Sequence, residues 1–341
     1  MASPTPLTPT MRAAQWRTIS NGIEKNLKVT TNARFPTLPK DHTLVKVSYA
    51  SLNHLDYKVA ELPFFSTFIT KPATPGLDFS GLVVSTTLDT LRPGQRVFGR
   101  TEPPVCGTLA EYVVVGKAGI AALPEGVALR DAACVGICGI AAFQALAPFV
   151  KPGSRVLING GSGGVGIFAI HIAKALGCAR VTAVCSGQNA EFCRSLGADD
   201  IFDYKKENLV MSLKRKEEFY DHILDTVFQN GDLYWQCHHY LAPGGTYVSV
   251  GLPLQFKTFR TLIGIYILPG FLGGGKRKFK FHSVTANTQD CAQVGQWIKE
   301  GKVRPVIEEE FELENAGKAY GKLKTERTVG KIVVRVCGEP D

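Results

Sequence analysis

The sequence lacks the long apolar run that a membrane-spanning helix needs. Its nearest approach to the required length of about 18 apolar residues is Leu262 to Gly275, which is broken by Pro269 and several glycines. Residues 1–10 also lack a basic segment followed by an apolar one, so we expect a disordered leader and no secretory signal. These absences predict a soluble, cytoplasmic protein. The lack of acidic residues before Glu24 leaves an organelle-targeting leader as an alternative.

The nine cysteines include no Cys-x-x-Cys pair, and several lie in apolar runs. This pattern excludes a disulfide framework and predicts reduced, buried thiols in a reducing compartment. Apolar residues make up 45% of the chain, which excludes a disordered protein. The net charge of +9 favours anionic partners without naming one.

The 341 residues suggest two domains, at roughly 150 residues per domain. The first third is β-rich, with strands predicted at 44–50, 81–85, 96–99 and 111–115. An alanine-rich helix is predicted from 131 to 150. From Arg155 onward strands alternate with helices, which indicates an α/β fold with a doubly wound parallel sheet. A last strand at 331–336 is predicted to return to the first domain.

A glycine-rich loop follows the strand 156–158 and opens a predicted helix that runs to Ala175. It reads Gly-x-Gly-x-x-Gly at Gly161, Gly163 and Gly166. In this context the pattern predicts that a dinucleotide pyrophosphate binds to backbone amides at a helix N-terminus. The candidate cofactor residues are therefore Gly161, Ser162, Gly163, Gly164, Val165 and Gly166.

The end of the second strand of this domain indicates which cofactor binds. An NAD enzyme places an acid there for the ribose hydroxyls, whereas this chain has Cys185 to Asn189 without an acid. Ser186 and Asn189 can donate hydrogen bonds, and Arg194 or Lys205 can supply positive charge, although either could equally lie on a solvated face. We therefore expect NADPH.

These motifs together resemble the zinc-free branch of the medium-chain dehydrogenase/reductase superfamily that contains quinone oxidoreductases and enoyl reductases. The corresponding segments run from Met11 to Val336 and include 50–58, 75–81, 93–99, 107–112 and 195–199. The resemblance implies a GroES-like catalytic domain, formed by residues 11–135 and 291–341, and a Rossmann domain at 136–290. It also implies an active site in the cleft between them, hydride transfer from NADPH to an activated double bond or quinone, and commonly a homodimer.

Zinc-dependent relatives have a Cys where this sequence has Asn53, and a His where it has Leu77. Because leucine cannot ligate a metal, the three-residue site is incomplete. The four-cysteine lobe of those relatives is missing as well. Cys134 and Cys138 are better explained as core residues of a helix. We expect no metal.

Without a metal, hydrogen bonds or a proton donor must polarise the substrate carbonyl. The resemblance places Asn53 at the cofactor, so it is the first candidate for a contact with substrate or nicotinamide. Many quinone oxidoreductases have a Tyr five residues later, where this chain has Lys58 beside Tyr57. Lys58, Tyr57 or solvent is thus the candidate proton donor, with a surface lysine as the alternative for Lys58. Asp56 is expected to be a helix cap or a partner of Lys58.

The resemblance also places Tyr204 near the adenosine phosphate and Gly251 and Leu252 at the nicotinamide. Phe228 stands where relatives often have Gly in Asp-x-x-Gly. Residues 259–275 read as a glycine-broken apolar loop, followed by the basic run 276–280. This segment is interpreted as a subunit interface, with a pocket lining for an apolar substrate or contact with an anionic membrane as alternatives.

The leading hypothesis is an NADPH-dependent reductase of hydrophobic α,β-unsaturated carbonyls or quinones, including an enoyl reductase of a biosynthetic pathway. One alternative is a non-redox rearrangement or cyclisation on the same fold. Another is a nucleotide- or RNA-binding module with little turnover. Aromatic residues do not interleave with the basic runs, which argues against RNA, and nothing in the sequence indicates DNA.

Overall fold

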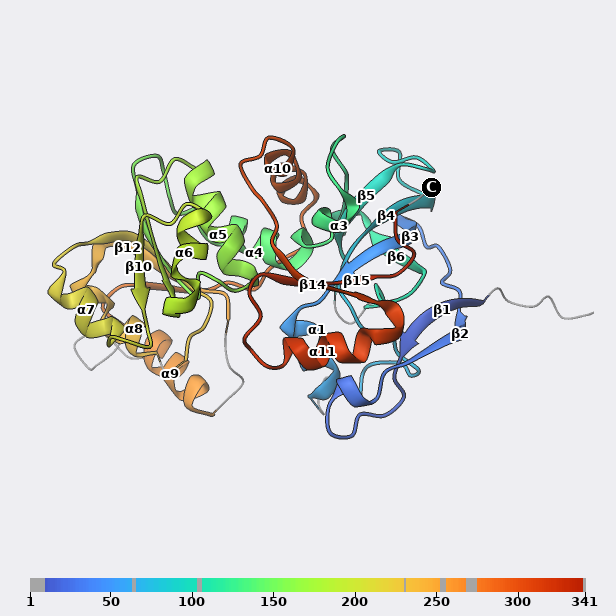
Figure 1. The fold of residues 1–341 in the computed structure, drawn as a ribbon, viewed down its shortest axis with the longest axis horizontal. Helices are drawn as coiled ribbons and strands as arrows, with labels where there is room; N and C mark the ends of the chain where they lie inside the picture. The colour runs from blue at the N-terminus through green and yellow to red at the C-terminus, as the bar shows by residue number, and fades with distance from the viewer. Residues whose placement is uncertain are drawn as a thin grey trace, which may run out of the picture. The chain divides into compact units, whose positions relative to one another are not determined.

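The computed structural model describes residues 10–62, 66–102, 106–229, 231–251, 256–267 and 275–339 (Figure 1). The chain divides into two compact units. The β-rich unit comprises Met1–Cys138, Ala286–Lys299 and Pro305–Asp341, and the parallel-sheet unit comprises Gly139–Thr285 and Glu300–Arg304. The boundaries predicted from the sequence, after 135 and after 290, lie close to these. The predicted leader falls outside the described residues except for Thr10, which begins a strand.

The β-rich unit contains a seven-stranded sheet in the order β14-β15-β3-β4-β5-β7, with β6 also paired to β3. Its strands are β3 (His42–Ser51), β4 (Asp78–Thr86), β5 (Arg96–Arg100), β6 (Tyr112–Gly116), β7 (Ile120–Ala122), β14 (Ile307–Glu312) and β15 (Lys331–Arg335). Strands β1 (Thr10–Gln15) and β2 (Lys28–Arg34) form a separate antiparallel pair. The helices are α1 (His54–Glu61), α3 (Leu129–Ala132), α10 (Thr288–Lys299) and α11 (Ala316–Leu323).

The last strand, β15, pairs antiparallel with β3 of the β-rich unit, with Val333 opposite Ser51. The two strands lie in the middle of the sheet, between β14 and β4. Most residues of β3 are buried, and Val45 and Val47 lie in the hydrophobic core of this unit. Residues more than 270 positions apart in the chain are therefore neighbours at the end of β3.

The parallel-sheet unit has six parallel strands in the order β10-β9-β8-β11-β12-β13. They are β8 (Arg155–Asn159), β9 (Arg180–Cys185), β10 (Asp200–Asp203), β11 (Tyr220–Asp225), β12 (Leu241–Ser249) and β13 (Lys278–Phe281). The helices are α4 (Ile140–Leu146), α5 (Gly164–Ala175), α6 (Ala190–Ser195), α7 (Leu209–Arg215), α8 (Asp232–Trp235) and α9 (Phe256–Ile267). The chain runs outward from β8 in both directions, so right-handed crossovers place helices on both faces of the sheet. This is the predicted doubly wound sheet.

Two sequence predictions for helices and loops were wrong in detail. The single helix predicted at 131–150 is divided into α3, a π-helical turn at Val135–Gly139 and α4. Gly136 explains the division: a Cβ there would lie 2.5 Å from the Gly99 carbonyl oxygen, so the backbone approaches β5 too closely for a side chain. Of the apolar loop predicted at 259–275, residues 259–267 belong to α9 instead. Residues 268–274 lie outside the described residues.

All nine cysteines are free thiols, and seven of them are buried. Among the described residues, no helix is both long and apolar enough to cross a bilayer.

His222 lies on β11 with its ring fully buried and stacked on Phe149, the ring centroids 5.3 Å apart. Burial lowers the pKa of His222 to about 4, and this effect outweighs the influence of the Ala145 and Thr246 backbone, which raises the pKa. The unfolded chain gains a proton near pH 6.5, whereas the folded chain gains it only near pH 4. Stability should therefore be lost as the pH falls through this window. At pH 5 the loss from this residue is about 2 kcal/mol relative to pH 7.

We expect His222→Phe, which keeps a ring against Phe149, to reduce the difference between urea unfolding free energies at pH 7 and pH 5 by about that amount. The matched control is His42→Phe, on a partly exposed histidine of β3. An unchanged pH dependence in His222→Phe would contradict the assignment of the buried neutral ring.

Candidate functional site

The glycine loop lies between β8 and α5 in the parallel-sheet unit, as the sequence predicted. Gly160 has φ +89°, in the left-handed region that glycine adopts without strain. A Cβ at Gly166 would lie 2.1 Å from the Gly160 carbonyl oxygen, so the first turn of α5 packs directly on the loop backbone. A Cβ at Gly163 would meet only that same oxygen, at 3.5 Å.

Gly163 is the N-cap of α5, and the first backbone N–H groups of this 12-residue helix have no partner within the helix. Such amides form a site for an anion. The open space at Gly163 lies at this end of the helix, and so the residues fit the pyrophosphate of a dinucleotide.

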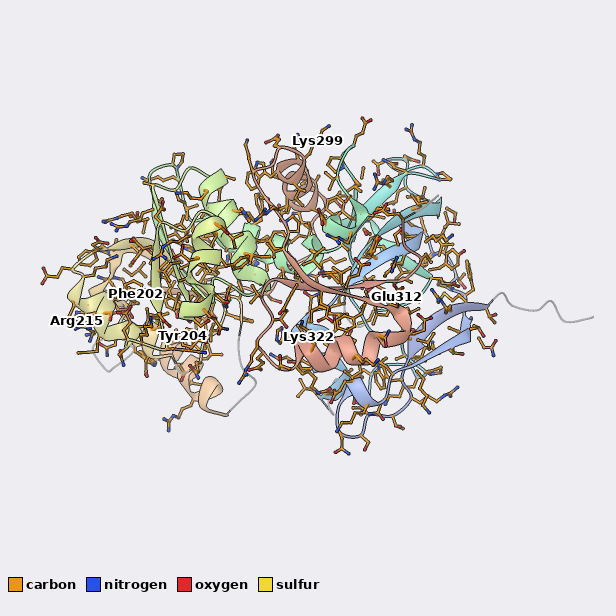
Figure 2. The ribbon with its side chains drawn as sticks, viewed as in Figure 1. Phe202, Tyr204, Arg215, Lys299, Glu312 and Lys322 are labelled. Atoms are coloured by element: carbon orange, nitrogen blue, oxygen red, sulfur yellow. The ribbon has the colours of Figure 1, made fainter. Side chains whose placement is uncertain are left out.

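The loop after β9 is joined to the glycine loop by a hydrogen bond. Asn189 donates from Nδ2 to Ser162 Oγ at 3.1 Å, so two predicted cofactor residues are neighbours. Ser186 is buried directly after β9. Tyr204 projects from the turn after β10 and is exposed (Figure 2).

An acidic side chain near this loop was missed by the sequence reasoning. Asp203 ends β10, and its Oδ2 lies 2.3 Å from the position that a Cβ of Gly187 would take. Its carboxylate accepts a hydrogen bond from the Lys205 backbone N–H at 3.0 Å, and Lys206 Nζ lies 4.0 Å away. Tyr204 and Lys205, which follow Asp203 in the chain, were expected near the cofactor from the sequence, but Asp203 itself was not. The parallel register pairs Asp203 with Cys185, and this pairing places the end of the third strand beside the loop that follows the second.

A buried carboxylate beside the glycine loop forms hydrogen bonds that join three neighbouring strands. Asp225 on β11 accepts hydrogen bonds from Asn159 Nδ2 at 2.8 Å and from the Tyr247 hydroxyl. It also accepts the backbone N–H groups of Val227 and Phe228, both at 2.9 Å. Burial and the contact with Asp225 raise the pKa of Tyr247 well above its usual range, so it stays a hydrogen-bond donor.

These bonds hold the turn after β11 against both neighbouring loops. Cβ atoms at Gly160 and Gly251 would meet Thr226 Oγ1 at 2.2 Å and the Thr226 carbonyl oxygen at 2.5 Å. Phe228 has φ +43°, which accounts for the glycine that relatives often have there. Its ring is nonetheless buried in the core of the unit, 5.8 Å from the ring of Phe279. Leu252 lies outside the described residues.

In the β-rich unit, Asn53 is buried at the start of α1 in a polar network. Its Oδ1 accepts a hydrogen bond from Lys331 Nζ at 2.6 Å and lies 3.4 Å from Cys138 Sγ. Its Nδ2 donates to the Ser51 carbonyl oxygen at 3.3 Å. Lys331 on β15 is 2% exposed and lies 3.6 Å from Asp78 Oδ2.

Lys331 was not recognised from the sequence, although its strand was. Burial by itself would lower the pKa of Lys331, but Cys138 and Asp78 raise it to well above the usual range, so the side chain is an ammonium ion. Burial raises the pKa of Asp78, and this effect is opposed by Lys331 and by the Asn53 amide.

Asp56 does cap α1, as expected, by accepting the Asn53 backbone N–H at 2.8 Å. The Tyr320 hydroxyl donates to the same carboxyl oxygen at 3.4 Å. Burial raises the pKa of Asp56 to about 8, so much of this group is protonated at neutral pH. No ion pair joins Asp56 to Lys58 among the described residues.

The two candidate proton donors on α1 differ in their surroundings. Tyr57 is buried in the core, with Lys324 Nζ 5.4 Å from the centre of its ring, and burial raises its pKa to about 12. Lys58 is partly exposed. No hydrogen bond or ion pair of its side chain occurs among the described residues. Lys58 is therefore the more accessible of the two candidates.

Leu77 is fully buried and offers no metal ligand. Within the part of the chain that the structure describes, no group of three or more His, Cys, Asp or Glu side chains could hold a metal ion.

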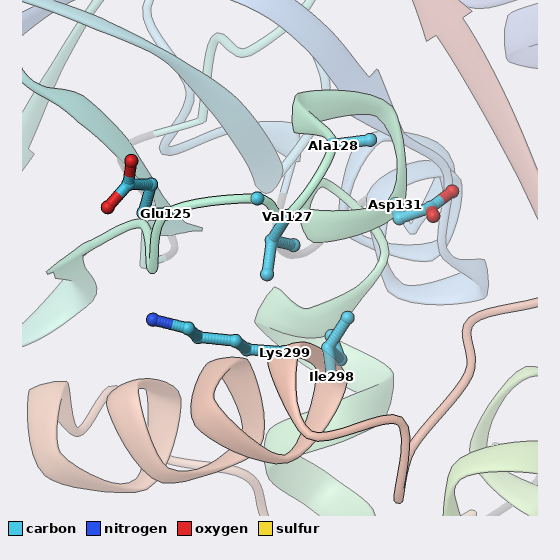
Figure 3. A pocket seen from close by; sticks show the side chains of 7 residues that line it. Glu125, Val127, Ala128, Asp131, Ile298 and Lys299 are labelled. Carbon is cyan, nitrogen blue, oxygen red and sulfur yellow. The ribbon is translucent and has the colours of Figure 1, made fainter.

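A shallow pocket of about 460 Å³ lies elsewhere in the β-rich unit (Figure 3). Residues 125–128 and Asp131 line one side, opposite Ile298 and Lys299 at the end of α10. None of the predicted site residues lines it.

The chain was compared with known families and proteins. Residues 39–125 match the alcohol dehydrogenase GroES-like domain, and residues 196–334 match the zinc-binding dehydrogenase domain. The chain is 43% identical to trans-enoyl reductase pgmF of Aspergillus terreus, over 98% of each chain. It is 30% identical to the mitochondrial NAD(P)H oxidoreductase RTN4IP1 of Homo sapiens, over 94% of this chain and 88% of the relative. Among solved structures, the quinone oxidoreductase of Coxiella burnetii superposes with a TM-score of 0.80 at 29% identity, covering 96% of this chain and 99% of that one.

Proposed function

The chain belongs to the medium-chain dehydrogenase/reductase family, in its enoyl and quinone reductase branch, and we propose that it uses NADPH to reduce an α,β-unsaturated thioester. We choose this substrate because the chain is 43% identical to a trans-enoyl reductase over nearly the whole of both chains. A relative of this kind also suggests a place in natural-product biosynthesis.

The preference for NADPH is supported by the loop after β9. Ser186 and Asn189 offer hydrogen bonds where an NAD enzyme has an acid, and Lys205 and Arg194 lie nearby in sequence. Arg194 is paired with Glu191 on the exposed face of α6. The Asp203 carboxylate would repel the additional phosphate of NADPH. However, it accepts a hydrogen bond from the Lys205 backbone N–H and lies near the Lys206 ammonium group, and both reduce this repulsion.

NADPH, when bound at the N-terminus of α5, supplies the hydride. In our proposal Asn53 donates a hydrogen bond from Nδ2 to an oxygen of the substrate or the nicotinamide. Its bond to the Ser51 carbonyl oxygen is long, at 3.3 Å, and is the one that a ligand could replace. Lys58 gives a proton to the carbon next to the carbonyl, because its side chain is partly exposed, whereas Tyr57 is buried and burial raises its pKa to about 12, which makes it a weak acid.

Quinone reduction is the second candidate, favoured by the similarity to a quinone oxidoreductase over almost the full length. A quinone takes hydride on oxygen or ring carbon and can then draw its proton from solvent. Lys58 would matter little in that case. A homodimer, as the resemblance implies, and a cytoplasmic location, as the sequence led us to expect, are part of the proposal.

The experiment is NADPH oxidation, followed by its near-ultraviolet absorbance, with a short enoyl thioester and a small benzoquinone as acceptors. NADH runs in parallel, and the affinity of each cofactor is measured by fluorescence titration. We expect turnover of the thioester with a preference for NADPH. Tight NADPH binding with no turnover of either acceptor would instead favour a non-redox reaction on this fold.

A further inference from the structure

Lys331 reaches the start of α1 from the far end of the chain. Its Nζ donates to the Leu52 carbonyl oxygen at 3.0 Å, to Asn53 Oδ1 at 2.6 Å and to Cys138 Sγ at 3.4 Å. The side chain is 2% exposed, so these contacts are shielded from water. A buried ammonium is costly unless its donors are used, and here each has an acceptor.

The contact with Lys331 fixes which way the Asn53 amide faces. An ammonium ion only donates hydrogen bonds, so the Asn53 atom 2.6 Å from Nζ has to be the oxygen. The amide nitrogen therefore faces away from Lys331, toward the Ser51 carbonyl oxygen and Asp78. With this orientation Asn53 can donate a hydrogen bond to a ligand that replaces its long bond to the Ser51 carbonyl oxygen.

The distances around Nζ favour the amide over the carboxylate. Asp78 Oδ2 lies 3.6 Å from Nζ, beyond the usual 2.7–2.9 Å of a charge-assisted hydrogen bond. Asp78 instead accepts a hydrogen bond from Ser51 Oγ at 3.2 Å. The carboxylate thus balances the buried charge, while the directional bonds of Lys331 go to Leu52 and Asn53 at the end of β3.

We propose that Lys331 is a positioning residue that holds the Asn53 carboxamide with its nitrogen presented as a donor to an oxygen of the substrate or the nicotinamide. This inference rests on the proposed function, in which Asn53 makes that contact. Asp78 supplies the counter-charge that lets the ammonium stay buried. The hydrogen bond between Lys331 and Asn53 thus connects a strand near the C-terminus with a residue 278 positions earlier in the chain.

The test is a double-mutant cycle on kcat and KM with Lys331→Met, Asn53→Ala and the combination of both. Lys331→Met should lower kcat by about 10-fold or more, the effect of a lost charged hydrogen bond. In the Asn53→Ala background the same substitution should change kcat by less than about 2-fold, because the residue it positions is already gone.

A second variant separates positioning from stability. Lys331→Met alone leaves Asp78 without its counter-charge, so its melting temperature should fall. Lys331→Met/Asp78→Asn removes both charges. We expect it to recover much of the melting temperature while kcat stays low, because the bond to Asn53 is still missing.

Three results would overturn the proposal. Recovery of kcat together with melting temperature in Lys331→Met/Asp78→Asn would show a purely structural role, and additive losses in the cycle would show that Lys331 does not act through Asn53. Full activity of Asn53→Ala would refute the contact assigned to Asn53 and its positioning, with the reductase itself intact. A wild-type protein inactive on both acceptors would refute the proposed function and this inference with it.

Discussion

Replacing Gly163 by Asp should abolish NADPH binding without destabilising the protein. The residue has φ −80° and is the N-cap of α5, and a Cβ there meets only the Gly160 carbonyl oxygen at 3.5 Å. Asp is a favoured N-cap, and its charge suits the helix N-terminus. The same carboxylate would occupy the place proposed for the pyrophosphate and repel it. We expect the dissociation constant of NADPH to rise at least about 100-fold, which is about 2.7 kcal/mol, with an unchanged or higher melting temperature.

Two controls make the effect of charge visible. Gly163→Asn has the same shape as the Asp variant without its charge, and Gly163→Ala adds only the Cβ. Both should bind NADPH more tightly than Gly163→Asp. Equal affinities in the Asp variant and the wild-type protein, measured by fluorescence titration, would contradict the placement of the pyrophosphate at this helix.

Replacing Lys58 by Met should lower kcat for the enoyl thioester by about 100-fold, the low end of the range for general acid catalysis. Methionine keeps much of the aliphatic side chain on α1 while removing the proton donor. NADPH affinity should stay unchanged, because the substitution leaves the glycine loop untouched. The rate with a quinone should fall far less, since solvent can protonate that product.

The matched control is Lys28→Met, which removes an exposed lysine from β2 of the same unit. It should leave both rates as they are. An equal loss of rate with thioester and quinone in Lys58→Met would indicate that Lys58 binds the substrate. Normal rates with both acceptors would show that Lys58 is a surface lysine with no catalytic role.

The alternating and apolar runs were enough to predict the main strands of both units, and the glycine loop was located with its flanking strand and helix. Strands β1 and β2 were not predicted. In β1 all positions but Thr10 are buried or partly buried, whereas in β2 only Ala33 is fully buried and most positions are exposed. Their pairing with each other is what makes them strands, and it is not a local property of either segment.

The parts of the candidate site that escaped prediction depend on distant neighbours. A lysine at the start of β15 reads as a solvent-exposed position, and it is buried only because Leu52, Asn53 and Asp78 surround it. Asp203 ends an unremarkable short strand and reaches Gly187 only through the register of β10 with β9. A single sequence specifies the residue types in such clusters but does not reveal which of them meet.

Following the hydride itself tests most directly whether the protein is an enoyl reductase. The wild-type protein would be incubated with NADPH carrying deuterium at the transferable position of nicotinamide C4 and with an enoyl thioester, and the product analysed by mass spectrometry and NMR. We predict a saturated thioester with one deuterium on the β-carbon and a solvent-derived proton on the α-carbon. A thioester recovered unsaturated and without deuterium, while NADPH is bound, would contradict it.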